Sequence, residues 1–169
     1  RERIDHLVDP GSYVETGLLA VSSVVAEDRE TTPADGKVAG FARVGGRPVG
    51  VVSNDFTVKG ASSSLTNMKK IGHVKRVATE RGFPLVFLGE SSGARMPDNM
   101  GSRGMGTLLG NDPQQYVRHR ESPWVSAVMG QCYGSSAWYS CLADFTVMRK
   151  GATLAVASPA LASLAIGQQ

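Results

Sequence analysis

The chain has 169 residues and a net charge of +3, from 18 lysine and arginine residues against 15 aspartate and glutamate residues. Its 41% apolar and 20% charged residues provide enough hydrophobic material for one packed domain, which argues against disorder, and the length is short for two domains. The charge excess is too small to indicate binding to nucleic acid or to a membrane, and we expect neither.

The N-terminal part is predicted to combine a short helix, extended chain and a loop. Residues 1–8 place their apolar side chains on a short helical face, which a turn at Asp9-Pro10-Gly11 ends. Residues 13–25 are expected to be mostly extended. The polar stretch 27–36 is interpreted as a surface loop.

The clearest local signal is a β-hairpin. Residues 37–44 alternate along the chain, the pair Gly45-Gly46 provides a tight turn, and residues 48–53 resume as a second strand. Two strands joined by such a turn are predicted to pair antiparallel.

A long helix is predicted from Leu65 to Arg81, because apolar residues recur there at three- and four-residue steps. Ser62-Ser63-Ser64 offers N-cap residues before it, and Gly82 ends it. The charged side chains of this helix are expected to form a solvated face; they are Lys69, Lys70, Lys75, Arg76 and Glu80.

The second half of the chain alternates apolar strands with helices. Strands are predicted at 84–88, 124–129, 145–148 and 153–156, and helices at 112–120 and 135–142. Short continuous apolar runs between helices are typical of strands buried on both faces. The alternation predicts an α/β fold built from crossover units.

Two of the strand ends look alike. Leu88 leads into the small residues of 89–97, and Met129 leads into those of 130–137. Glycine and serine let a ligand approach the main chain closely, and a helix N-terminus leaves N–H donors free. On neighbouring strands, two such ends would form a two-donor oxyanion hole. The alternative is that these glycines only permit tight packing of helix on strand.

Several motifs occur in an order that resembles the carboxyltransferase subunits of biotin-dependent acyl-CoA carboxylases. They are found at residues 1–15, 37–40, 55–57, 92–95, 130–140 and 144–148. The resemblance covers nearly the whole chain and implies a crotonase-like fold, a ββα superhelix. It identifies residues 1–169 as the N-terminal, acyl-CoA-binding carboxyltransferase domain, incomplete at its C-terminal end.

The resemblance also implies an activity and partners. Family members move a carboxyl group from carboxybiotin to the α-carbon of an acyl-CoA thioester, so biotin on a carrier protein is the implied cofactor and a CoA thioester the substrate. The implied partners are a C-terminal carboxyltransferase half or second subunit, a biotin carboxyl carrier and biotin carboxylase. The implied assembly is a homo- or hetero-oligomer, such as a hexameric ring.

By resemblance, the donors that hold the thioester enolate come from Gly93-Ala94 and Gly134-Ser135, and biotin itself is the base. Main-chain N–H groups in a dry pocket can stabilise such an oxyanion without a titratable side chain. For CoA we select Lys59, Ser62 and Arg95 as binding candidates. Arg95 has an alternative role, a structural ion pair with Glu90 or Asp98.

The chain departs from the family pattern at both donor loops. Ser92 and Ser135 stand where the family has glycine, and Tyr133 adds bulk beside the second loop. A side chain in place of a hydrogen narrows a pocket and disfavours positive φ. We interpret this as a divergent member with an altered acyl pocket, and lost or changed chemistry is the alternative.

Three further functions stay open at this point. The chain could serve a biotin-dependent acyl-CoA decarboxylase, or act alone as a crotonase-type hydratase or isomerase, with Glu90 or Asp98 as the base. It could also be a non-catalytic assembly module with an occluded pocket.

The remaining signals concern location and cover. The histidines and cysteines are too scattered for a metal site, so we expect no metal. Cys132 and Cys141 are expected to be buried, reduced thiols in a cytoplasmic protein, and the charged start of the chain is unlike a signal peptide. Residues 121–169 are nearly free of charge. Part of this segment is expected to face a partner half.

Overall fold

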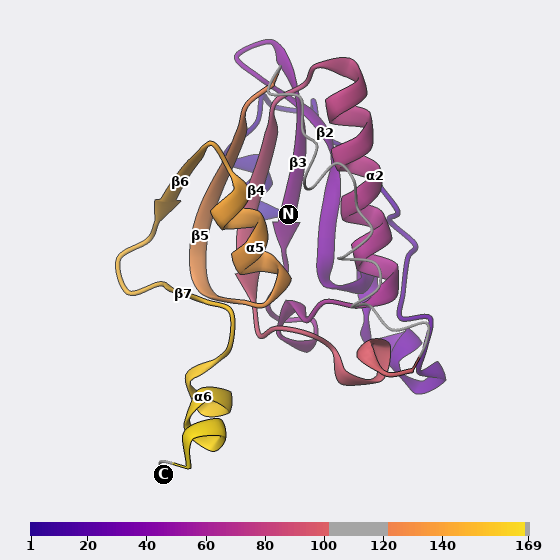
Figure 1. Cartoon of the computed structure of the whole chain (residues 1–169). Coiled ribbons are helices and arrows are strands. Elements are labelled where there is room, and N and C mark those ends of the chain that lie inside the picture. The colour runs from indigo at the N-terminus through magenta and orange to yellow at the C-terminus, as the bar shows by residue number, and fades with distance from the viewer. Residues whose placement is uncertain (102–121, 168–169) are drawn as a thin grey trace.

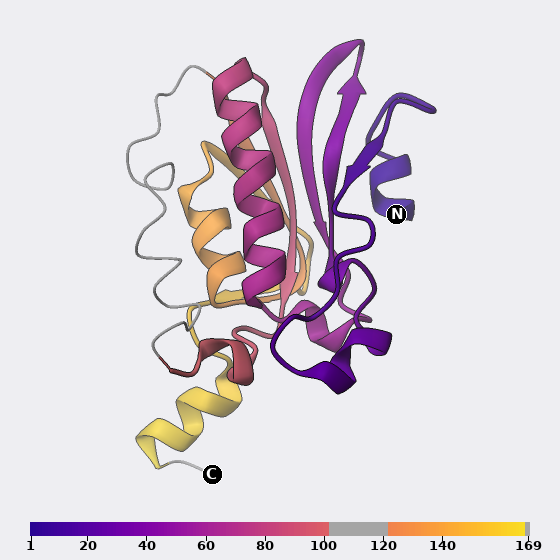
Figure 2. The same ribbon diagram turned by 90° about the vertical axis from the view of Figure 1, so that its right-hand side faces the viewer.

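The computed structural model describes residues 1–101 and 122–167. Helices α2 and α5 cover one face of a mixed sheet, and the short helix α1 lies on the other face (Figures 1 and 2). The strand order is β1-β2-β3-β4-β5-β6, with β7 paired to β5. The strands are β1 Val14–Thr16, β2 Lys37–Val44, β3 Arg47–Asn54, β4 Leu85–Ser91, β5 Trp124–Tyr133, β6 Phe145–Met148 and β7 Thr153–Ala155. The α-helices are α1 Glu2–Asp5, α2 Leu65–Arg81, α5 Ser135–Leu142 and α6 Pro159–Ile166, and short 3-10 turns occupy Ala26–Thr31, Pro33–Gly36, Lys59–Ala61 and Met96–Asn99.

The predicted hairpin is confirmed. Strands β2 and β3 pair antiparallel from Lys37 opposite Asn54 to Val44 opposite Arg47. Gly45 and Gly46 have φ values of 57° and 77°, the left-handed conformation that a two-residue hairpin turn of this hand requires.

The long helix is confirmed at its predicted bounds. Ser64 and Asn67 form a capping box, in which each side chain bonds the other residue's backbone N–H. Gly82 ends the helix in the left-handed conformation. The helix buries its apolar side against the sheet in a cluster formed by Ala39, Val52, Met68, Ile71, Val74, Leu85, Phe87, Trp124 and Tyr139.

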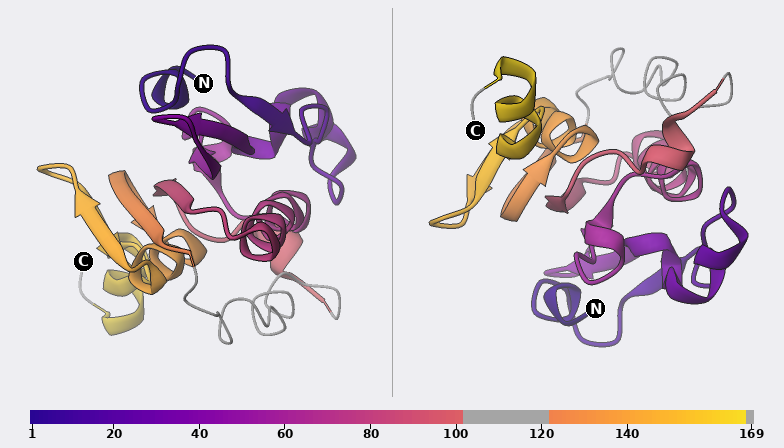
Figure 3. Two further views of the ribbon diagram at one scale, coloured as in Figure 1. Left: turned by 90° about the horizontal axis from the view of Figure 1, so that it is seen from above. Right: turned by 90° about the horizontal axis from the view of Figure 1, so that it is seen from below.

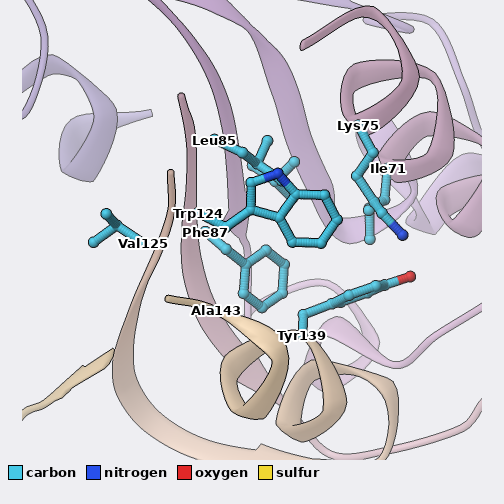
Figure 4. Close-up of a pocket in the computed structure, with 9 residues that line it drawn as sticks. Ile71, Lys75, Leu85, Phe87, Trp124, Val125, Tyr139 and Ala143 are labelled. Carbon is cyan, nitrogen blue, oxygen red and sulfur yellow. The ribbon is translucent and has the colours of Figure 1, made fainter. Parts of the chain in front are cut away.

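The expectation of a fully solvated charged face on α2 is wrong at two positions, Lys70 and Lys75, which are both buried. The Lys75 ammonium lies 5.4 Å from the ring centre of Trp124 and 5.0 Å from that of Tyr139 (Figure 4). A lysine can bury its long aliphatic stem, and an aromatic face attracts its charge. Charge alone therefore did not predict exposure on this helix.

Strands β3, β4, β5 and β6 run parallel, as the alternation of strands and helices predicted. Two of them extend further than predicted: β4 continues to Ser91 and β5 to Tyr133. The extra residues pair with each other, since Ser91 lies opposite Cys132. Because β4 and β5 are adjacent and parallel, the loops at their carboxyl ends lie at the same edge of the sheet.

Two expectations for the N-terminal part are corrected. Within 13–25 only Val14–Thr16 forms a strand, because Gly17 turns the chain with a φ of 65°. The stretch 27–36 is not all surface, since Thr32 and Asp35 are fully buried. The predicted helix at 112–120 lies outside the described residues.

The C-terminal end adds a helix, α6, that the sequence patterns did not predict. It lies beyond the end of the sheet and away from α1 (Figures 1 and 3). Its N-cap is Ser158, whose hydroxyl accepts a bond from the Leu161 N–H at 3.3 Å. Apolar side chains of this end are exposed; they include Phe145, Val147, Met148, Val156, Leu161, Leu164 and Ile166.

Candidate functional site

The two similar strand ends meet. A Cβ atom placed on Gly134 would lie 3.3 Å from Gly93 Cα and 3.7 Å from the Ala94 nitrogen. Gly134 has φ 63° and ψ −130°, a combination that L-residues essentially never adopt. Glycine is therefore required here twice, by its backbone conformation and by the close approach of the other loop.

The backbone N–H groups of these loops fall into two kinds. The Gly93 N–H donates to Ser91 Oγ at 3.1 Å, and the Gly134 N–H donates to Val156 O at 3.1 Å. In residues 1–101 and 122–167, the N–H groups of Ala94 and Ser135 have no acceptor. Of the four residues predicted to supply donors, two therefore carry an N–H that remains available where the loops touch.

A third segment, Ser62–Ser64, joins the two loops. Ser63 pairs with the first loop through its backbone: its N–H donates to Gly93 O at 2.8 Å, and its carbonyl accepts from the Arg95 N–H at 2.8 Å. Its hydroxyl contacts the hydroxyl of Ser135 in the second loop. Ser135 thus makes a specific bond to this third segment.

The turn that precedes this segment has an unusual backbone. Lys59, Gly60 and Ala61 have φ values of 49°, 60° and 47°, all in the left-handed region. Gly60 also lies under Ser92, because a Cβ at Gly60 would be 2.7 Å from Ser92 Oγ. The Ser92 N–H donates to Gly60 O at 2.8 Å. Ser92 and Ser135 therefore both contact the 60–63 segment.

Arg95 is buried, and its partner differs from the two predicted ones. Its Nη1 donates to Asp35 Oδ1 at 2.6 Å, rather than to Glu90 or Asp98. Its Nε and Nη2 donate to Ser62 Oγ at 3.1 Å and to Ser62 O at 3.3 Å. Arg95 and Ser62, two of the CoA-binding candidates, thus bond to each other inside the protein. The prediction missed Asp35 because it lies in the stretch interpreted as a surface loop.

Lys59, the third candidate, lies at the surface. Its Nζ donates to Asp28 Oδ1 at 2.7 Å, and its side chain remains 42% exposed. Of the three candidates, it is the one whose charge can still reach a dissolved phosphate.

Sequence reasoning also missed two buried lysines near the site. Lys37 Nζ donates to Ala61 O at 2.7 Å, and Lys70 Nζ donates to Lys37 O at 2.6 Å and Ala34 O at 2.8 Å. Burial lowers the pKa of both amines, and that of Lys37 falls to about 7. The position of Lys37, first in an otherwise uncharged run of apolar and small residues, was the signal available in the sequence.

The two carboxylates considered as a base, Glu90 and Asp98, are bonded to other groups. Glu90 accepts from Arg3 Nη1 at 2.6 Å, on the side of the N-terminal helix. Asp98 is buried, and its Oδ1 accepts from the Leu65 N–H at 2.8 Å, at the start of α2. Glu90 is therefore held in an ion pair, whereas Asp98 is held through Oδ1, and its buried Oδ2 has no partner among the described residues.

The cysteines and possible metal ligands add no reactive centre. Cys132 is buried and free, and burial raises the pKa of its thiol. Cys141 is free but exposed, so the expectation of two buried thiols holds for only one. Within the described ranges, no cluster of three histidine, cysteine or carboxylate side chains could hold a metal ion. The helices described there include none that is long and apolar enough to cross a membrane.

Comparison with known proteins gives one family over the whole chain. Residues 1–169 match the carboxyl transferase domain. The methylmalonyl-CoA carboxyltransferase 12S subunit of Propionibacterium freudenreichii is 31% identical over 173 residues, covering 99% of this chain and 32% of that protein. The human mitochondrial propionyl-CoA carboxylase beta chain is 35% identical over 158 residues, covering 89% of this chain and 28% of that one. The chain thus spans about a third of the length of these relatives.

Solved structures agree with the sequence relatives. A single-chain, multi-domain long-chain acyl-CoA carboxylase superposes with a TM-score of 0.88 at 31% identity, covering all of this chain and 18% of that one. The transcarboxylase 12S hexamer with bound methylmalonyl-CoA superposes with a TM-score of 0.83 at 30% identity, covering all of this chain and 33% of that one. The crotonase-like fold implied by the resemblance is confirmed.

Proposed function

The chain belongs to the carboxyl transferase domain family, and from this premise we propose that it is the acyl-CoA-binding half of a biotin-dependent carboxyltransferase. The relatives that share its sequence are a methylmalonyl-CoA carboxyltransferase and propionyl-CoA carboxylases. These names support a CoA thioester as the substrate class and carboxyl transfer as the reaction.

One observation carries the proposal: where the two loops touch, the N–H groups of Ala94 and Ser135 find no acceptor among the described residues. Removal of the α-proton of a thioester puts negative charge on its carbonyl oxygen. Two backbone donors stabilise that charge without a titratable group and without reorganisation. Ser135 adds the N-terminal end of α5, which favours a negative charge.

The other residues of the site are proposed to orient the thioester and hold the donors. Gly93 and Gly134 use their own N–H groups internally, and this fixes the loops that carry the two free donors. Carboxybiotin, presented by a carrier protein, would supply the carboxyl group and then the base. This division is supported by the candidate bases of the chain, because Glu90 is paired with Arg3 and Asp98 accepts from the start of α2.

We propose that Lys59 contacts a phosphate of CoA, since its charge is partly exposed at the start of the Lys59–Ala61 turn. Ser62 and Arg95 are proposed to support the site without contacting CoA. Their mutual bonds and the ion pair of Arg95 with Asp35 hold Ser62–Ser64 in place. The CoA-binding role is thus divided between one contact residue and two supporting residues.

The proposed partners follow from the relatives. A C-terminal carboxyltransferase half or second subunit, a biotin carboxyl carrier and biotin carboxylase would complete the enzyme. The hexamer of the transcarboxylase 12S protein supports a ring-shaped oligomer. The two free cysteines support a cytoplasmic location.

A stand-alone hydratase or isomerase is less well supported, because it needs a carboxylate base near the donors. Glu90 is paired with Arg3 and Asp98 with the start of α2. A decarboxylase would use the same two N–H donors. Carboxylation of an acyl-CoA and decarboxylation of a carboxyacyl-CoA are therefore assayed separately to distinguish the two activities.

The experiment removes one donor. Ser135 is the first residue of α5, where proline is tolerated but lacks an N–H. In the chain assembled with its C-terminal half, Ser135→Pro is expected to lower kcat for carboxyl transfer to propionyl-CoA by about 10²–10³-fold. Ser135→Ala keeps the N–H and removes only the hydroxyl, so it is the matched control. Equal activities of the two variants would refute the donor role of Ser135.

A further inference from the structure

Lys37 is a fully buried lysine whose side chain reaches the Lys59–Ala61 turn from inside the protein. It begins β2, it is 0% exposed, and its Nζ donates to Ala61 O at 2.7 Å. A buried amine needs a hydrogen-bond acceptor, and here that acceptor belongs to the turn formed by Lys59–Ala61. The bond therefore ties the first strand of the hairpin to the segment that carries the CoA-binding candidates.

The same carbonyl links Lys37 to the first donor loop. Ala61 O also accepts a bond from Ser91 Oγ at 3.0 Å, and Ser91 Oγ in turn accepts the Gly93 N–H at 3.1 Å. A continuous path of bonds thus runs from Lys37 through Ala61 and Ser91 to Gly93, the residue before Ala94. Loss of one bond in such a chain loosens its neighbours.

The Lys59–Ala61 turn needs this support, because its backbone adopts an unfavourable conformation. Lys59 and Ala61 are not glycines, yet both have φ near 48°. Residues in this region persist only where the surrounding structure holds them, and such places cluster at binding and active sites.

We propose that Lys37 is a positioning residue of the acyl-CoA site, which holds the 59–61 turn and, through Ser91, the first donor loop. It does not touch the substrate, since it is fully buried. This inference rests on the proposed function, because it assigns Lys37 to the same site.

The charges around Lys37 fit a supporting role. Asp35 is paired with Arg95 at 2.6 Å, so its carboxylate is shared between two cations. Cys132 and Asp35 favour the charged form of Lys37 and the Arg95 guanidinium opposes it, while burial has the largest effect. The backbone carbonyl of Lys37 accepts from Lys70. Burial lowers its pKa to about 7, and a neutral amine still donates to Ala61 O. The bond therefore persists whether or not the amine carries a charge.

The test uses the chain assembled with its C-terminal half, with propionyl-CoA as the probe. Lys37→Met keeps the aliphatic volume and removes the donor. It is expected to lower kcat/KM at least 10-fold, with a higher KM and a lower kcat. Lys75→Met is the matched control, since Lys75 is also buried but its ammonium lies over the rings of Trp124 and Tyr139. It should change kcat/KM less than twofold at temperatures where all variants are folded.

A double-mutant cycle separates positioning from general destabilisation. Ser91→Ala removes the second donor to the same carbonyl and provides a milder variant if Lys37→Met does not fold. The fold-changes in kcat/KM caused by Lys37→Met and Ser91→Ala should not multiply in the double variant, because the two residues share one carbonyl. Those caused by Lys75→Met and Ser91→Ala should multiply, as independent effects do. Equal kcat/KM for the Lys37 and Lys75 variants, or strict additivity in the first pair, would overturn the inference. If the unaltered assembly neither binds nor carboxylates any acyl-CoA, the proposed function itself fails.

Discussion

The loop region of the site and the C-terminal end of the chain differ in what covers their side chains. Asp35, Lys37 and Arg95 are charged residues and are at most 6% exposed. Val156 and Leu164 are apolar and are 71% and 79% exposed. Polar groups are thus sealed inside one region, while apolar groups face outward in the other.

The difference concerns which contacts the described residues can make by themselves. In the loop region, buried donors such as those of Lys37 and Arg95 find acceptors on neighbouring segments of the same chain. At the C-terminal end, α6 offers apolar side chains for which the described residues provide no cover. An exposed apolar surface of this kind is typical of an interface. The site loops are therefore held from within, and the C-terminal end suits contact with further protein.

The largest effect is expected from breaking the buried ion pair. Arg95→Met leaves Asp35 buried without its partner and should destabilise the chain by about 3–5 kcal/mol. Urea unfolding measures this loss. The double variant Asp35→Asn with Arg95→Met removes the uncompensated charge and should regain part of it. A single variant as stable as the parent would show that the loop region does not depend on this pair.

A smaller effect is expected where the two donor loops touch. Gly134→Ala should cost about 1–3 kcal/mol, because it forces a strained backbone and places a Cβ 3.3 Å from Gly93 Cα. Gly151→Ala is the control, since Gly151 also has a positive φ of 84° but has nothing within 4 Å of the added Cβ. In thermal unfolding, the Gly134→Ala variant should have a clearly lower midpoint temperature than the Gly151→Ala variant. Equal losses would mean that the approach of the loops can relax freely.

The stability of the loop region is also expected to depend on pH through Lys37. Burial lowers the pKa of Lys37 from 10.5 to about 7, so above that pH the folded chain lacks a proton that the unfolded chain retains. This contribution to stability is complete above pH 10.5 and is lost as the pH falls through 7. Between about pH 8 and 9.5, the unfolding free energy should rise by about 1.4 kcal/mol per pH unit relative to Lys37→Met. Parallel curves for the two proteins would contradict the low pKa.

The smallest effect on folding is expected at the C-terminal end. Leu164→Ser removes a side chain that is 79% exposed, so it should change the unfolding free energy by less than about 0.5 kcal/mol. If this end forms an interface, the same change should weaken association with the C-terminal half, which analytical ultracentrifugation measures. A large loss of stability in the isolated chain would place Leu164 in its core instead.

The elements that the sequence predicted correctly are those that local patterns determine. The alternation around Gly45-Gly46 specified the hairpin, and the periodicity from Leu65 to Arg81 specified α2 with its bounds. The meeting of the two donor loops followed from the order of parallel strands. Local sequence patterns were therefore sufficient to predict how the main chain of the site is arranged.

The polar network behind the loops could not be predicted in the same way. Lys37 is 24 positions from Ala61 and Asp35 is 60 positions from Arg95 along the chain. No local pattern connects residues so far apart, and charge suggested exposure for side chains that the fold buries. The burial of Lys70 and Lys75 was missed for the same reason.

The left-handed turn at Lys59–Ala61 has an evolutionary consequence. Each of its two non-glycine residues carries roughly 1–2 kcal/mol of backbone strain, in a fold whose total stability is typically only about 5–15 kcal/mol. Substitutions that let this turn relax would release free energy instead of consuming it. Mutations can therefore reshape this turn, which lies beside the proposed acyl-CoA site, without first weakening the fold.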